Sequence, residues 1–184
     1  MTDQLNRSER DPERVNESIR LLQQRRGLQL FKNGSIAAAT TQKIDSIPDS
    51  FAYLVLHLAG VSSDTATRQP LIRVSTDNGA TFDATAGNYV GRKVTGTTFT
   101  ALSLGSLIES ATVTAAQTFT VSIYIFGYQG GTNPWASARI ISNTVEYECS
   151  SRYIGSTSPI NALRLLWDAS GSFDAGTFAL YGAG

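Results

Sequence analysis

The pattern of apolar and polar positions changes once along the chain, near residue 30. Before that point, apolar residues recur with a helical spacing. Val15, Ile19 and Leu22 lie at i, i+4 and i+7, on one narrow stripe of a helix. Asp11 can cap the free amides of the first turn of this helix. The sequence therefore predicts a short, polar α-helix within residues 1–30.

From residue 31 onward the period of the apolar positions becomes two, which is the period of a strand with one buried face. In the segment 118–126 the apolar residues of one face are Phe119, Val121, Ile123 and Ile125. Other segments that favour strands are 51–59, 71–76, 81–82, 88–94, 97–102, 138–147, 160–167 and 176–181. Because no crossover helices separate them, we expect an all-β fold over residues 31–184, an antiparallel β-sandwich of jelly-roll type.

One turn between these segments carries a recognisable pattern. Asp77, Asn78 and Gly79 form a typical hairpin signal. Ser75 to Phe82 resembles the Asp box of sialidases and other β proteins, S-x-D-x-G-x-T-W, with Phe82 in place of Trp. In those families the box is structural, and its Ser and Asp satisfy backbone groups of the turn. The resemblance implies a hairpin here and no activity.

Charge is sparse, balanced and unevenly distributed. Fifteen Lys and Arg oppose fifteen Asp and Glu, so binding to nucleic acid through many phosphate contacts is not expected. No apolar run reaches the roughly 20 residues of a membrane span. Residues 1–26 hold eleven of the thirty charged residues, six arginines and five acids. We expect residues 1–30 to anchor the chain to a larger assembly through Val15, Ile19 and Leu22. The alternative is a helix folded back on its own domain.

Residues for catalysis are scarce. The single histidine, His57, lies in the most apolar predicted strand, which favours a core or interface position. The single cysteine, Cys149, allows neither an intramolecular disulfide nor an ordinary Cys/His zinc site. Glu146 and Glu148 share a strand face, as a glycosidase pair would, but an exposed polar face explains them equally well. The sequence predicts no catalytic residue, no cofactor and no metal ligand.

Two aromatic residues are the best candidates for a contact with a ligand or partner. Trp135 follows Asn133 and Pro134 in a segment bounded by Gly and Pro, where an exposed ring stacks well on a sugar or a partner protein. Tyr128 lies close by in the sequence. The alternative is that Trp135 folds over the end of the sandwich. Trp167, within an apolar segment, is expected to be buried.

The last forty residues resemble a recurrent ending of bacteriophage structural proteins. A strand of the type "INALRLLW", here 160–167, is followed by "AGTFALYG", here 175–182. The segment "RVSTDNGATFD", 73–83, is also similar to these proteins. The resemblance implies a virion component without a cofactor, made in the host cytoplasm, either a tail fibre or appendage or a capsid decoration such as a head fibre. It also implies a homotrimer, with Ile140, Ile141 and Leu107 as candidate interface residues.

We therefore expect a non-enzymatic virion protein, docked by its N-terminal segment on other capsid or tail proteins and displaying a β-sandwich. A host-surface glycan is a further expected partner, and neither nucleic acid nor membrane is expected. The alternative function is a carbohydrate-binding module or a fragment of a carbohydrate-active enzyme.

Overall fold

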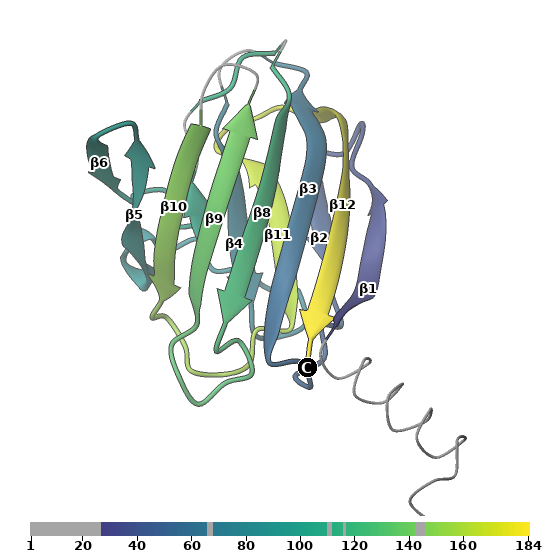
Figure 1. The fold of residues 1–184 in the computed structure, drawn as a ribbon, viewed down its shortest axis with the longest axis vertical. Coiled ribbons are helices and arrows are strands. Elements are labelled where there is room, and N and C mark those ends of the chain that lie inside the picture. Colours follow the sequence, from purple (N-terminus) through teal and green to yellow (C-terminus); the bar gives the residue numbers. More distant parts are fainter. Residues whose placement is uncertain (1–26, 66–67, 110–111, 116, 143–145) are drawn as a thin grey trace, which may run out of the picture.

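The computed structural model describes residues 27–65, 68–109, 112–115, 117–142 and 146–184. Within these ranges the chain is nearly all β and forms two antiparallel sheets that face each other (Figure 1). The larger sheet has eight strands in the order β1-β12-β3-β8-β9-β10-β5-β6, and the smaller has four in the order β2-β11-β4-β7.

The strands of the larger sheet are β1 (Leu28–Ser35), β12 (Phe173–Ala183), β3 (Tyr53–Ser63), β8 (Phe119–Phe126), β9 (Trp135–Ser142), β10 (Glu146–Tyr153), β5 (Tyr89–Thr95) and β6 (Thr98–Ala101). The strands of the smaller sheet are β2 (Thr41–Ile44), β11 (Ala162–Trp167), β4 (Pro70–Ser75) and β7 (Ile108–Glu109). A single 3-10 turn, η2 (Ala86–Asn88), precedes β5 among the described residues.

The core lies between the two sheets, and β8 shows how the sequence determines its two faces. Phe119, Val121, Ile123 and Ile125 are all buried, as the sequence predicted, and the residues between them are at least partly exposed. Burying each such side chain contributes about 1.5 to 3 kcal/mol. Trp167 is also buried, and its ring packs against Phe119 and Phe173.

The predicted N-terminal helix, with Val15, Ile19 and Leu22, lies outside the described residues. Strand β1 begins at Leu28, which pairs with Ala183 of β12. Residues 28–30 therefore belong to the large sheet, although the sequence placed them in the N-terminal segment.

The segment 138–147, predicted as one strand, is divided between β9 and β10. The buried residues of β9 have even numbers, Ala136, Ala138 and Ile140, and those of β10 have odd numbers, beginning with Tyr147. This change of phase means that the chain cannot continue as a single strand, and β9 instead pairs antiparallel with β10. Part of β9 was thus recognised from the sequence, but β10 was not recognised as a separate strand.

Two of the three predicted interface residues belong to the core. Ile140 and Leu107 are buried between the sheets, because both lie on inward-facing positions. Ile141 follows on the opposite face of β9 and is 50% exposed. The prediction of an interface is therefore wrong for Ile140 and Leu107 and stays a prediction for Ile141.

The Asp-box segment forms a tight turn in which Ser and Asp bind backbone groups, as the resemblance implied, but the predicted hairpin is wrong. The Ser75 hydroxyl accepts hydrogen bonds from the backbone N–H groups of Asp77 (3.2 Å) and Gly79 (2.8 Å) and donates one to the Asp77 carboxylate (2.6 Å). That carboxylate also accepts bonds from the backbone N–H (2.9 Å) and the hydroxyl of Thr81 (2.5 Å). The turn does not join two strands of one hairpin, because β4 and β5 lie in different sheets.

The Asp77 turn predicts a pH-dependent contribution to stability. Hydrogen bonds from Ser75 and then from Thr81 hold the pKa of Asp77 well below its ordinary value of 3.8. A depressed pKa in the folded state means that the stabilisation is present above about pH 3.8 and is lost as the pH falls below it. We expect Asp77→Asn to lower the unfolding temperature near neutral pH, and the difference from wild type to shrink in acid. Calorimetry across the pH range measures it, and a difference independent of pH would contradict this account.

Candidate functional site

The candidate site lies on the outer face of the large sheet, which is the face turned away from the small sheet. On β8 this face carries Thr120, Ser122, Tyr124 and Phe126, since the alternate residues fill the core. On β9 the outward residues are Trp135, Ser137, Arg139 and Ile141. Strand pairing aligns these residues in rows that run across the sheet.

Four aromatic side chains gather on this face, and we call them the aromatic platform: Tyr53, Tyr124, Phe126 and Trp135. Phe126 pairs with Tyr53 on one side and with Trp135 on the other. The Phe126 ring stacks on Trp135 at 4.3 Å between centroids and on Tyr53 at 5.3 Å. Tyr124 is nearly parallel to Phe126, with 15° between the ring planes.

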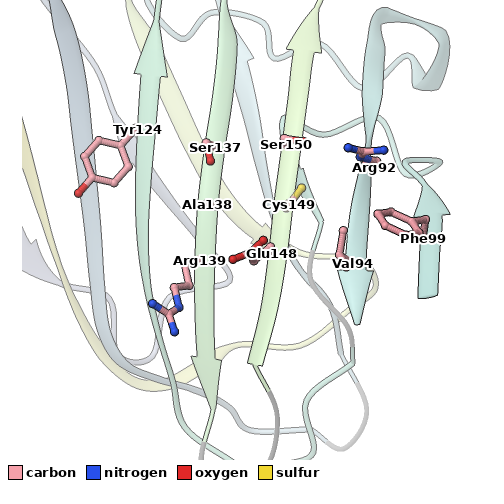
Figure 2. Close-up of a pocket in the computed structure, with 10 residues that line it drawn as sticks. All are labelled: Arg92, Val94, Phe99, Tyr124, Ser137, Ala138, Arg139, Glu148, Cys149 and Ser150. Atoms are coloured by element: carbon pink, nitrogen blue, oxygen red, sulfur yellow. The ribbon is translucent and has the colours of Figure 1, made fainter. Parts of the chain in front are cut away.

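The platform is accessible to a ligand. Trp135 is 47% exposed and Tyr124 is 44% exposed. Figure 2 looks onto the outer face and shows the Tyr124 ring broadside to the viewer. Because Phe126 stacks on both Trp135 and Tyr53, the apolar surface open to a ligand is that of Trp135 and Tyr124, which suits the C–H face of a sugar ring as well as another apolar surface.

Beside the platform lies a trough of about 450 Å³ that crosses β8, β9, β10, β5 and β6 (Figure 2). It is lined by Arg92, Val94, Phe99, Tyr124, Ser137, Ala138, Arg139, Glu148, Cys149 and Ser150. One row of the trough consists of polar groups, because Ser137 pairs with Tyr124 and with Ser150, and Ser150 pairs with Arg92. The trough therefore offers hydroxyl and guanidinium groups next to aromatic rings.

The charged side chains on this face differ in whether another side chain already binds them. Arg139 forms an ion pair with Glu146 and lowers the pKa of that carboxyl group. Glu148 pairs in register with Arg139, and Figure 2 shows its carboxylate directed toward β9. The Arg92 guanidinium lies over the Phe99 ring, 5.0 Å from its centroid. Because Arg139 and Glu146 compensate each other, Glu148 is the charged lining residue at this end of the trough for which no ion pair is found among the described residues.

Trp135, predicted as a contact residue, is exposed on the outer face, at the start of β9 rather than in a loop. Its role in binding stays a prediction. Tyr128, the second predicted contact, is fully buried, so the prediction is wrong for this residue. Its hydroxyl donates a hydrogen bond to the Pro48 carbonyl (2.7 Å) and accepts one from the Phe51 N–H (3.1 Å). Tyr128 therefore fixes the segment that leads into β3 and Tyr53.

His57 lies half-buried on the outer face of β3 and not in the core, because it is out of phase with the buried residues Leu56 and Leu58. Its Nδ1 is 3.1 Å from the hydroxyl of Ser122. No acidic partner of His57 is found among the described residues, so no nucleophile–base–acid arrangement is recognised there.

Of the two carboxylates that the sequence singled out, one has an ion-pair partner. Glu146 and Glu148 do share the outer face of β10, but Glu146 is bound to Arg139. Asp83 accepts bonds from Asn88 (2.7 Å) and Tyr153 (2.9 Å). Across the described ranges, no group of three or more His, Cys, Asp or Glu side chains is arranged to hold a metal ion.

Several residues of the site were not recognised from the sequence: Tyr53, Tyr124, Phe126 and Arg92. Phe126 and Tyr124 alternate with the buried residues of β8, and this phase is a signal that could have placed them outward. Their meeting with Tyr53 and Trp135 depends on strand order, because β3 and β8 are neighbours although far apart in sequence.

Comparisons with known proteins give little further information. No family model matches the chain, and no curated protein matches it. Among solved structures, the chain is similar to the crystal structure of the marine PL-14 alginate lyase from Aplysia kurodai, at 10% identity and a TM-score of 0.35. The similarity covers 84% of this chain and 80% of that chain. In the described part of the chain, no helix is both long and apolar enough to cross a membrane.

The Cys149 thiol is expected to be chemically inert, although Cys149 is among the residues that line the trough. It is 2% exposed, and burial raises the pKa of its thiol to about 11. Because the thiolate is the reactive form, the folded protein should not react with an aromatic disulfide reagent near pH 8. One equivalent should react after denaturation. Rapid labelling of the folded protein would show that the thiol is accessible.

Proposed function

We propose that this domain is a carbohydrate-binding module that holds a saccharide chain on the outer face of its large sheet. The observation that carries the proposal is the aromatic platform beside a trough that contains serine and charged side chains. Aromatic faces bind the apolar face of sugar rings, and serine hydroxyls and charged side chains bind their hydroxyl groups. We propose binding and not catalysis: in this proposal the charged groups of the trough form hydrogen bonds to the ligand.

The extent of the surface supports a chain of several sugars rather than one. The platform spans β3, β8 and β9, and the trough continues over β10, β5 and β6. Neighbouring strands are about 4.8 Å apart, so the surface extends across the strands for more than about 20 Å. The residues that line the trough come from five neighbouring strands, which suits a ligand that lies across the sheet.

Trp135→Ala is the direct test of this proposal. Removal of a central aromatic contact should weaken saccharide binding about tenfold or more, which corresponds to about 1.4 kcal/mol. The measurement is isothermal titration of the full chain with a panel of neutral and acidic oligosaccharides.

Ile141→Ala is the matched control. It removes an exposed apolar side chain from the same face of β9, at the end far from the platform, and should leave affinity unchanged. Equal losses in both variants, or binding that survives Trp135→Ala, would refute the proposed site. A chain that binds no member of the panel would refute the function.

As a second candidate, we propose that the module belongs to a virion appendage or capsid decoration and acts as a homotrimer. The resemblance over residues 160–167 and 175–182 favours it, together with the charged segment that directly precedes β1. The resembling residues correspond to β11 and β12, which are internal strands. The nested pairing of β1 with β12, β2 with β11 and β5 with β10 supports a sandwich of jelly-roll type.

Removal of residues 1–26 tests whether this segment is an anchor. Because β1 begins at Leu28, the truncated chain should keep its β-sheet circular dichroism and its unfolding temperature within a few degrees. It should lose association with particles in co-sedimentation, whereas the full chain associates. A truncated chain that fails to fold would mean that the segment belongs to the domain core.

A further inference from the structure

The positive charges on the outer face gather next to the aromatic platform. Arg152 of β10 pairs directly with Trp135 of β9. Arg92 of β5 pairs with Ser150, two residues before Arg152 on the same face, so the two arginines are diagonal neighbours. Such neighbours are about 7 to 8 Å apart. Arg92 therefore lines the trough, and Arg152 is exposed on the same face beside it.

The negative charges lie toward the other end. Glu148 and Glu146 follow one another along the outer face of β10, away from Arg152. Glu146 is bound to Arg139. Glu148 pairs with Val94 and is therefore a diagonal neighbour of Arg92, but Figure 2 shows its carboxylate directed toward β9 and away from Arg92. In the described ranges neither Arg92 nor Arg152 has a carboxylate partner within ion-pair distance, and Arg92 instead lies over Phe99.

We infer that the saccharide is acidic and that its carboxylate groups bind Arg92 and Arg152. The inference rests on the proposed function and names its ligand class, a polymer that contains uronic acids. A guanidinium presents paired N–H donors that match a carboxylate, and the resulting charge-assisted bonds are stronger than neutral ones. A sugar stacked on Trp135 lies beside Arg152, its cross-strand partner, and the next sugar reaches Arg92.

A neutral saccharide would leave Arg152 without a negative partner among the described residues. Arg92 has Arg152 and Glu148 as diagonal neighbours, one of each charge, and a bound carboxylate adds a negative group on the side of Arg152. The aromatic rings select for a sugar ring, and the two arginines add selection for its charge. Of the acidic residues at the far end, Glu146 is held by Arg139, and Glu148 directs its carboxylate away from Arg92.

The test uses the full chain with polymers of galacturonic, glucuronic and mannuronic acid, each compared with its methyl ester. Esterification removes the charge and keeps the sugar backbone. We expect at least one free acid to bind about tenfold more tightly than its ester at low salt, with the difference reduced as salt rises. Arg92→Gln and Arg152→Gln should each remove most of that difference.

Lys43→Gln is the matched control. It removes one positive charge from an exposed position of β2 in the small sheet and should change affinity by less than about twofold. This inference would be overturned, and the proposed function left intact, if binding depended on Trp135 but the acid bound no more tightly than its ester or than neutral glycans. Binding of no acidic or neutral glycan would overturn both. If Lys43→Gln and the arginine variants lost affinity equally, the effect would depend only on the net charge of the protein, which would contradict specific recognition by Arg92 and Arg152.

Discussion

Burial of one face of each strand in the large sheet determines what the other face presents. On β8, Phe119, Val121, Ile123 and Ile125 must lie in the core, so Tyr124 and Phe126 must lie outside. A shift of one residue in the pairing would exchange the two faces and expose the core residues to water. The free energy of core burial therefore also fixes the register that aligns Phe126 with Tyr53 and Trp135. The arrangement of side chains on the outer face of the sheet is therefore a consequence of packing on its inner face.

The sequence was informative wherever local periodicity determined the outcome. It predicted the all-β class, the buried face of β8 and the burial of Trp167, but the hairpin that it predicted at the Asp box is a turn between two sheets. It did not separate β9 from β10, because the apolar spacing near residue 140 looks continuous unless its phase is followed. It also placed Tyr128 on the surface, where neighbouring glycines suggested a loop. Tyr128 is instead buried, since its hydroxyl is satisfied by the backbone of Pro48 and Phe51.

The composition of the candidate site could not be obtained from the sequence, because it depends on strand order. Tyr53 and Trp135 are separated by more than eighty positions and meet only because β8 lies between β3 and β9. Arg152 and Trp135 face each other because β9 and β10 pair in one particular register. Once these rows are known, the chemistry of the face follows from ordinary side-chain properties: flat apolar rings, hydroxyl groups and two guanidinium groups next to one another.

The central claim is that the outer face of the large sheet is the binding surface of this protein. It is tested most directly by nuclear magnetic resonance, following aromatic and arginine side-chain signals during titration with the oligosaccharide that binds most tightly. The account predicts that signals of Tyr124, Phe126, Trp135 and Arg92 shift first, while those of Phe82 and Arg164, which lie against each other at the small sheet, stay unchanged. Shifts confined to Phe82 and Arg164, with none on the aromatic platform, would contradict it.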